Sequence, residues 1–150
     1  MSSSLRALTS LRELYAESNS FGDAGAVSVS AALSSLTNLT VLAVSSNEVG
    51  AAGVTSLSAA LASLTSLQKL WIGNPMGAAG AAAFSRVLPL LTSLTFLSVA
   101  SSQLGDAGAA SMSSSLRALT SLRRQLFLLS RVNVKFFVLY WFFQDFQLLL

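Results

Sequence analysis

The sequence contains no cysteine and no histidine, and it carries little charge. Without cysteine there are no disulfides or thiol nucleophiles, and without histidine the commonest zinc ligand and the usual neutral-pH general base are missing. Charged residues make up 10% of the 150 residues, whereas hydrophobic residues make up 53%. Such a composition is typical of a chain that buries a core. We therefore expect one domain's worth of folded chain with no metal or cofactor.

The net charge of +3 is unevenly distributed along the chain. Residues 1–122 hold five basic and five acidic residues, so their charges cancel, and residues 123–150 hold four basic residues and one acidic residue. Residues 1–122 therefore have no excess of basic residues, which nucleic-acid binding requires, and we expect no nucleic-acid partner. The N-terminus also lacks the continuous apolar run of a signal peptide, which favours a cytoplasmic protein.

The stretch MSSSLRALTSLR occurs twice, at residues 1–12 and at residues 112–123. Between the two copies, leucines and glycine pairs recur together about every 28 residues. This self-similarity predicts a repeat protein. One leucine series is Leu11, Leu39, Leu67, Leu94 and Leu122, and the glycine pairs are Gly22/Gly25, Gly50/Gly53, Gly77/Gly80 and Gly105/Gly108.

The second unit shows how each repeat should fold. Leu42 and Val44 alternate with Ala43, which is the period-2 pattern of a short strand with one buried face. Asn47 follows where the strand must turn, and its amide can bind backbone groups that the bend leaves unpaired. Gly50 and its partner glycine then predict a tight turn into the next element. Apolar residues at three- and four-residue steps follow and predict a helix of about three turns. These residues are Val54, Leu57, Leu61 and Leu64.

The repeated pattern is L-x-x-L-x-[LVIA]-x-x-N-x-[LVFM]-G-x-x-G, followed by leucine or phenylalanine at helical spacing. In the clearest copy the matching residues are Leu39, Leu42, Val44, Asn47, Val49, Gly50 and Gly53. Over residues 5–122 the pattern resembles the long, ribonuclease-inhibitor-like class of leucine-rich repeats. The resemblance implies an α/β solenoid of about four repeats, a right-handed β/α superhelix with parallel strands on the concave face and helices outside.

Two units depart from the pattern. The third unit lacks one residue between Ile72 and Asn74 and continues with Pro75, so its turn must be tighter. The fourth unit has Ser102 where asparagine is expected. A ladder of asparagine side chains should therefore end before the fourth unit. Its members are Asn19, Asn47 and Asn74.

In such a solenoid, the strand residues between the buried ones face the concave surface, where we expect a protein or peptide partner to bind. Tyr15, Trp71 and Phe96 are the expected anchors, because aromatic side chains dominate binding hot spots. The predicted binding residues are Glu13, Tyr15, Glu17, Val41, Lys69, Trp71 and Phe96, and Ala43, Ser45, Ser98 and Ala100 share their face. An ordinary exposed strand face without a ligand is the alternative interpretation.

Nothing in the sequence indicates catalysis. The glycine pairs recur once per unit and no lysine follows them as in a P-loop, so they mark the repeat and not a phosphate site. The many serines have no histidine to activate them. Glu13 and Glu17 lie roughly 13 Å apart along a strand, which is too far to share a metal ion. We therefore expect a non-catalytic scaffold.

Residues 123–150 form a hydrophobic, aromatic-rich tail of different composition. Three interpretations stay open: a cap over the last repeat, a membrane anchor, and an extension that is not native to the repeat array. An anchor would place the protein on the cytoplasmic face of a membrane through residues 126–150, although the uncharged run 136–144 is shorter than a span. The alternative function is accordingly a membrane-tethered or self-assembling structural protein.

The first copy of the duplicated stretch suggests a further expectation. By alignment with residues 112–123, the chain begins inside a repeat, at the point where a helix is already under way. We therefore expect a fragment of a longer array whose uncapped ends could self-associate.

Overall fold

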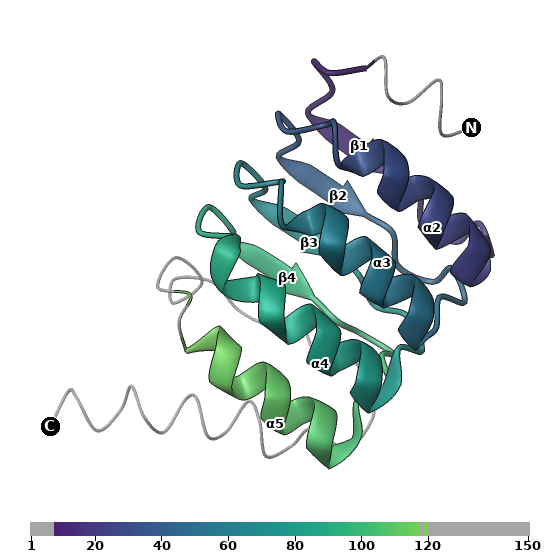
Figure 1. Ribbon diagram of the computed structural model, residues 1–150, viewed down its shortest axis with the longest axis vertical. Coiled ribbons are helices and arrows are strands. Elements are labelled where there is room, and N and C mark those ends of the chain that lie inside the picture. Colours follow the sequence, from purple (N-terminus) through teal and green to yellow (C-terminus); the bar gives the residue numbers. More distant parts are fainter. Residues whose placement is uncertain (1–7, 118, 120–150) are drawn as a thin grey trace, which may run out of the picture.

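The computed structural model describes residues 8–117 and residue 119, and in this part of the chain strands and helices alternate (Figure 1). Each strand has three residues, and each is followed by a helix of 11 or 12 residues. The predicted repeat of strand, turn and helix is confirmed. The elements are β1 (Glu13–Tyr15), α2 (Gly22–Leu33), β2 (Val41–Ala43), α3 (Ala51–Leu61), β3 (Lys69–Trp71), α4 (Gly77–Val87), the 3-10 turn η1 (Leu88–Leu90), β4 (Phe96–Ser98) and α5 (Gly105–Leu116).

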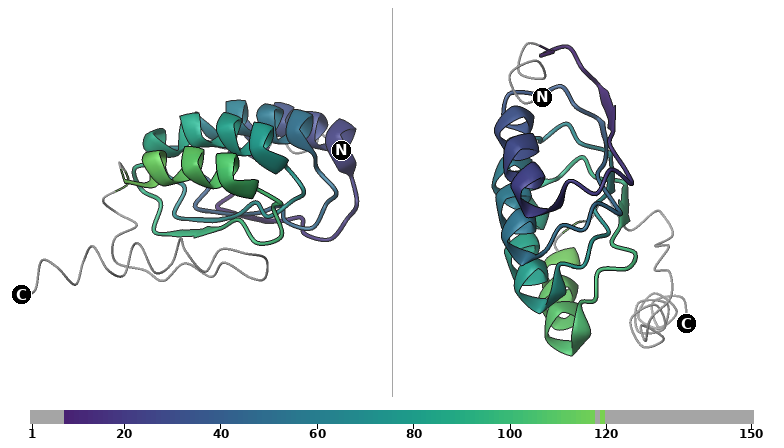
Figure 2. Two further views of the ribbon diagram at one scale, coloured as in Figure 1. Left: turned by 90° about the horizontal axis from the view of Figure 1, so that it is seen from below. Right: turned by 90° about the vertical axis from the view of Figure 1, so that its right-hand side faces the viewer.

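The four strands form one parallel sheet in the order β1-β2-β3-β4. Its register follows the repeat, because Leu14, Leu42, Leu70 and Leu97 are aligned across the sheet. The helices form a second layer on one side of this sheet (Figure 2). Neighbouring helices need about 10 Å each, whereas neighbouring strands need only about 4.8 Å, so the sheet side is the shorter, concave side. The predicted solenoid is confirmed.

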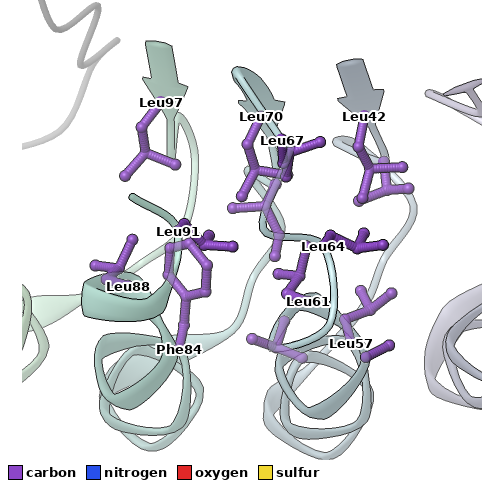
Figure 3. Close-up of a cluster of buried hydrophobic side chains, with 14 of the residues drawn as sticks. Leu42, Leu57, Leu61, Leu64, Leu67, Leu70, Phe84, Leu88, Leu91 and Leu97 are labelled. Atoms are coloured by element: carbon purple, nitrogen blue, oxygen red, sulfur yellow. The ribbon is translucent and has the colours of Figure 1, made fainter. Parts of the chain in front are cut away.

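The core lies between the two layers. Leu42, Leu70 and Leu97 point from the strands toward residues of the helices, among them Leu61 and Phe84 (Figure 3). These strand and helix residues are at most 2% exposed. Each unit therefore buries its apolar face against its neighbours, as the resemblance implied.

The element boundaries differ slightly from the expected ones. Helix α3 ends at Leu61, so Leu64 lies in the turn that follows, although it is still fully buried. The turn is tightened by bonds of the i to i−3 type, in which the amide of Leu64 binds the carbonyl of Leu61 at 2.9 Å. Strand β2 ends at Ala43, one residue before Val44, whose amide still donates to the carbonyl of Trp71 at 2.8 Å.

The asparagine ladder is present and ends where the sequence predicts. The Oδ1 atom of Asn47 accepts the backbone N–H of Asn19 at 2.7 Å, and the Oδ1 atom of Asn74 accepts the backbone N–H of Asn47 at 2.7 Å. In the fourth unit the buried hydroxyl of Ser102 has no hydrogen-bond partner in the described part of the chain. One rung of the ladder is therefore missing between the third and fourth units.

One contact between helices was not foreseen from the sequence. The Oδ1 atom of Asp23, in the first turn of α2, accepts the backbone N–H groups of Gly50 at 2.7 Å and Gly53 at 2.9 Å. It thus caps the N-terminus of α3 from the neighbouring unit. A Cβ on Gly53 would lie 2.9 Å from the Cβ of Ala26, so this glycine is required for the close approach of the two helices.

Several expectations concern residues that the structure does not describe. The start of the chain inside a repeat falls on residues 1–7, and the tail at residues 123–150 lies outside the described residues. The division between a repeat domain at 1–122 and a tail at 123–150 stays a prediction. Among residues 8–117 and 119, no helix is long and apolar enough to cross a membrane.

Candidate binding surface on the concave sheet

The register of the sheet arranges the predicted binding residues in rows across the strands. Adjacent parallel strands lie about 4.8 Å apart, so the rows bring together side chains that are about 28 positions apart in the sequence. The first row is Glu13, Val41, Lys69 and Phe96, and the second row is Tyr15, Ala43, Trp71 and Ser98. We call the surface formed by these two rows, with Glu17 and Ser45 beyond the strand ends, the concave face.

The β1 end of the concave face is acidic and carries an exposed aromatic ring. Glu13, Tyr15 and Glu17 are all exposed, and Tyr15 keeps 61% of its surface in contact with solvent. The Tyr15 hydroxyl donates to Oε2 of Glu13 at 3.1 Å, and the Ser45 hydroxyl donates to Oε1 of Glu17 at 2.9 Å. Both carboxylates thus accept hydrogen bonds from neutral hydroxyl groups and lie on the exposed surface.

The two carboxylates change the pKa of the Tyr15 hydroxyl. Its hydrogen bond to Glu13 raises the pKa of the Tyr15 hydroxyl, and the negative charges of Glu13 and Glu17 add to the effect. Both causes act in the same direction, because an ionised phenol would lose its donor proton and would be repelled by the two carboxylates. The hydroxyl of Tyr15 therefore stays protonated, and the negative charge at the β1 end resides on the two glutamates.

The opposite end of the concave face is aromatic and carries one cation. The rings of Trp71 and Phe96 lie with their centroids 4.6 Å apart at an interplanar angle of 39°. Both side chains are half-buried, and Lys69 beside them is exposed. Trp71 and Phe96 are diagonal neighbours, since Trp71 pairs in register with Ser98 and Phe96 pairs with Lys69. Such a diagonal is within reach of aromatic side chains, and the tilted contact restricts the orientation of both rings.

The expected exposure was wrong for three residues of the concave face. Val41 is 7% exposed, Ala43 is 1% exposed and Ser98 is 8% exposed. Ala43 lies between Tyr15 and Trp71 in its row, and its short side chain does not reach past these larger neighbours. Val41 is likewise flanked by longer side chains, and Ser98 lies beside Trp71. These residues form the floor of the face and not its contact groups.

The concave face therefore has two accessible ends separated by a low apolar floor. The acidic patch consists of Glu13, Tyr15 and Glu17, and the aromatic patch consists of Trp71, Phe96 and Lys69. Sequence reasoning identified all six residues from strand alternation, but it did not identify the Trp71–Phe96 stacking or the hydroxyl donors to the glutamates. The i, i+2 spacing of Glu13 and Tyr15 was the available signal for one of these contacts, because it places both side chains on one face.

In the described part of the chain, no group of three or more histidine, cysteine, aspartate or glutamate residues is placed to hold a metal ion. Glu13 and Glu17 lie on the same side of the sheet but are separated along the strand, and each binds its own hydroxyl donor. The concave face thus presents two carboxylates, one ammonium group and three aromatic rings.

Comparison with known proteins agrees with the repeat structure. Residues 35–58 and 91–113 match the family model described as Leucine Rich repeat. The fold is similar to the solved C-terminal domain of tropomodulin from Caenorhabditis elegans, with a TM-score of 0.73 and 14% sequence identity over 98% of this chain and 92% of that chain. No curated protein matches the sequence. The chain contains leucine-rich repeats, which generally mediate protein binding and are typically non-catalytic.

Proposed function

We propose that this protein is a non-catalytic interaction module of the cytoplasm that binds a protein or peptide partner on its concave face. The class of repeat supports a binding role in general, and the arrangement of side chains supports this face in particular. A solenoid presents its strands as a rigid, extended surface, so a partner can bind without the ordering cost that a flexible loop would carry.

One observation carries the proposal: the large and charged side chains of the concave face project at its two ends above a floor of buried small residues. Tyr15 is 61% exposed, whereas its in-register neighbour Ala43 is 1% exposed. Aromatic side chains that project from a surface, such as Tyr15 at one end of the face and the half-buried Trp71 and Phe96 at the other, are typical of binding hot spots.

The test replaces the three aromatic anchors together. The variant Tyr15→Ala/Trp71→Ala/Phe96→Ala should lose at least about 90% of the partner recovered by affinity capture with the full chain, because removal of hot-spot side chains costs more than tenfold in affinity. A matched variant on the helix layer, Val27→Ala/Leu90→Ala, removes side chains that are 53% and 49% exposed. It should recover the same partner as the wild type.

Both variants must first give the far-UV circular dichroism spectrum of the wild type. If the concave variant is folded and still captures every partner in wild-type amounts, the proposal fails. If both variants lose the partner equally, the concave face is not the specific surface, and the proposal fails in this case also.

The alternative function, a membrane-tethered or self-assembling structural protein, depends on residues 123–150 and on the ends of the solenoid. A specific comparison separates it from the proposal. In membrane fractionation, the full chain should sediment with membranes and a chain ending at Leu122 should not. Recovery of the full chain as a monomer without membranes would exclude the alternative.

A further inference from the structure

The concave face has a charge asymmetry that restricts its partner. Glu13 and Glu17 place two negative charges near the exposed ring of Tyr15, and both accept hydrogen bonds from uncharged hydroxyls. The only cation in the two rows is Lys69, which lies two strands away from Glu13 in the same row. An aromatic ring between two carboxylates favours a cationic group over a neutral or anionic one, because the ring face and both carboxylates attract positive charge.

The distance between the two ends of the face restricts the partner further. Tyr15 and Trp71 are in the same row, with Ala43 between them, so their positions are two strand spacings or about 9.6 Å apart. In a polyproline II helix, side chains three residues apart lie on the same side at about 9.3 Å. In a β-strand, side chains on the same side lie about 7 Å or about 13 Å apart. The spacing of the two ends thus matches a polyproline II segment.

The low floor of the face suits such a segment. Val41 and Ala43 of β2 separate the two ends of the face and are at most 7% exposed, so no long side chain projects from β2 between them. The tilted, contacting rings of Trp71 and Phe96 offer an apolar surface at the other end of the face, and aromatic surfaces of this kind accept proline-rich segments. Because a polyproline II segment is already extended before binding, it loses little entropy when it docks.

We propose that the partner segment is an extended, proline-rich peptide with a lysine or arginine over Tyr15, between Glu13 and Glu17, and an apolar residue three positions further along on Trp71 and Phe96. This inference rests on the proposed function and adds the chemistry of the ligand. Lys69 orients the segment, because it repels a second cation from the aromatic end and attracts an acidic group or a carbonyl there.

The test uses three synthetic peptides and the full chain with Trp141→Phe, which leaves Trp71 as the single tryptophan of the two in the sequence. The peptide PRPPLPP has arginine and leucine three positions apart. The peptide PEPPLPP reverses the charge, and PRPLPPP keeps the composition but places arginine and leucine two positions apart. Titration is followed by Trp71 fluorescence at low ionic strength, because surface charges are screened by salt.

We expect PRPPLPP to bind with a saturable change in Trp71 fluorescence, PEPPLPP to bind at least about tenfold more weakly, and PRPLPPP to bind several-fold more weakly. Raising the salt concentration should weaken PRPPLPP and strengthen PEPPLPP, because salt screens the attraction of one peptide and the repulsion of the other. No saturable change with PRPPLPP up to about 2 mM would overturn the inference. Equal affinities for PRPPLPP and PEPPLPP would overturn it as well, and equal affinities for PRPPLPP and PRPLPPP would exclude the polyproline II spacing.

Variants of the acidic patch provide the second measurement. The double variant Glu13→Gln/Glu17→Gln keeps acceptors for the Tyr15 and Ser45 hydroxyls but removes the charge, and it should lose the preference for PRPPLPP over PEPPLPP. The double variant Glu13→Lys/Glu17→Lys should reverse the preference, which a misfolded protein could not do. The matched control Asp106→Asn changes a charge on α5, away from the concave face, and should leave both affinities unchanged.

The two proposals fail in different ways. If the aromatic variant of the previous section loses its partner and the peptides show no charge preference, the proposed function stands and the inference about a basic, proline-rich segment is wrong. If the aromatic variant keeps all partners, the proposed function itself is wrong. A charge preference that Glu13→Gln/Glu17→Gln does not alter would place the cation elsewhere and would also refute the inference.

Discussion

Replacing Asn47 by alanine tests whether the asparagine ladder stabilises the solenoid. The Asn47 side chain is fully buried, accepts the N–H of Asn19 at 2.7 Å, and donates to the carbonyl of Ala16 at 2.7 Å. It also donates to the carbonyls of Val44 at 3.0 Å and Ser45 at 3.1 Å. Alanine removes all four hydrogen bonds. Of the four backbone groups that Asn47 binds, however, only some are left without a partner.

Two of the backbone groups keep another hydrogen bond. The carbonyl of Val44 still accepts from Nδ2 of Asn74 at 2.8 Å, and the carbonyl of Ser45 still accepts from the N–H of Ser18 at 3.1 Å. The N–H of Asn19 and the carbonyl of Ala16 lose the bonds described above. A backbone group left unpaired away from water costs about 1–3 kcal/mol, and the carbonyl that loses its bond belongs to the half-buried Ala16. Removal of the fully buried Asn47 side chain also leaves a cavity, so we expect Asn47→Ala to lower the free energy of unfolding by about 3 kcal/mol.

The assay is urea unfolding followed by far-UV circular dichroism. With a slope of about 2 kcal/mol per molar urea for a domain of this size, a loss of about 3 kcal/mol lowers the midpoint by about 1.5 M. The matched control is Asn19→Ala, because the exposed amide of Asn19 donates only to the carbonyl of Glu17 at 3.0 Å. It should cost less than about 1 kcal/mol. If both variants unfold at the same midpoint, the ladder does not provide the stability assigned to it.

Three further changes test individual contacts. Ser102→Asn should restore the missing rung by accepting the backbone N–H of Asn74, and thus raise the unfolding free energy by about 1 kcal/mol in the same urea assay. Asp23→Ala removes the acceptor for two N–H groups at the start of α3 and should cost about 1 kcal/mol, measured as a lower melting temperature. Glu13→Gln should lower the pKa of the Tyr15 hydroxyl toward its usual value, because the hydrogen-bonded carboxylate that raises it becomes neutral, and absorbance at alkaline pH in a Tyr140→Phe background measures this shift.

Each of these changes has an outcome that contradicts it. Unchanged stability of Ser102→Asn would show that the fourth unit has no room for an amide. The control for Asp23→Ala is Asp106→Ala, which lies in the same GDAGA pentapeptide and in the first turn of α5, so it shares the helix-dipole effect but has no described bond to a following helix. Equal effects at the two aspartates would mean that the contact with α3 adds nothing. An unchanged Tyr15 pKa would mean that the hydrogen bond to Glu13 does not persist in solution.

Strand alternation predicted which side chains point toward the concave side, but it did not predict how far they project. Tyr15 and Ala43 both lie on this side, yet they are 61% and 1% exposed. Ala43 lies between the larger Tyr15 and Trp71, whereas Tyr15 lies on the edge strand β1 and has only the small Ala43 as its in-register neighbour among the described strands. That relation exists only once the sheet has set the register of the units.

The sequence by itself determined the features that are local or repeat in register. Leucine spacing determined the units, the parallel register and the core, because residues at the same place in each repeat pack against each other. The replacement of asparagine by Ser102 also predicted where the ladder ends, since each rung needs an amide in the following unit.

The tertiary structure decided the contacts that depend on side chains from different units. The capping of α3 by Asp23, the contact between the rings of Trp71 and Phe96, and the bond from Ser45 to Glu17 each join residues about one repeat apart. None of the three recurs in every described unit, since Ala51 and Ala78 stand at the positions equivalent to Asp23. A repeat pattern describes what the units share. The side chains of the concave face are what the units do not share, and they meet only after the similar backbones have stacked.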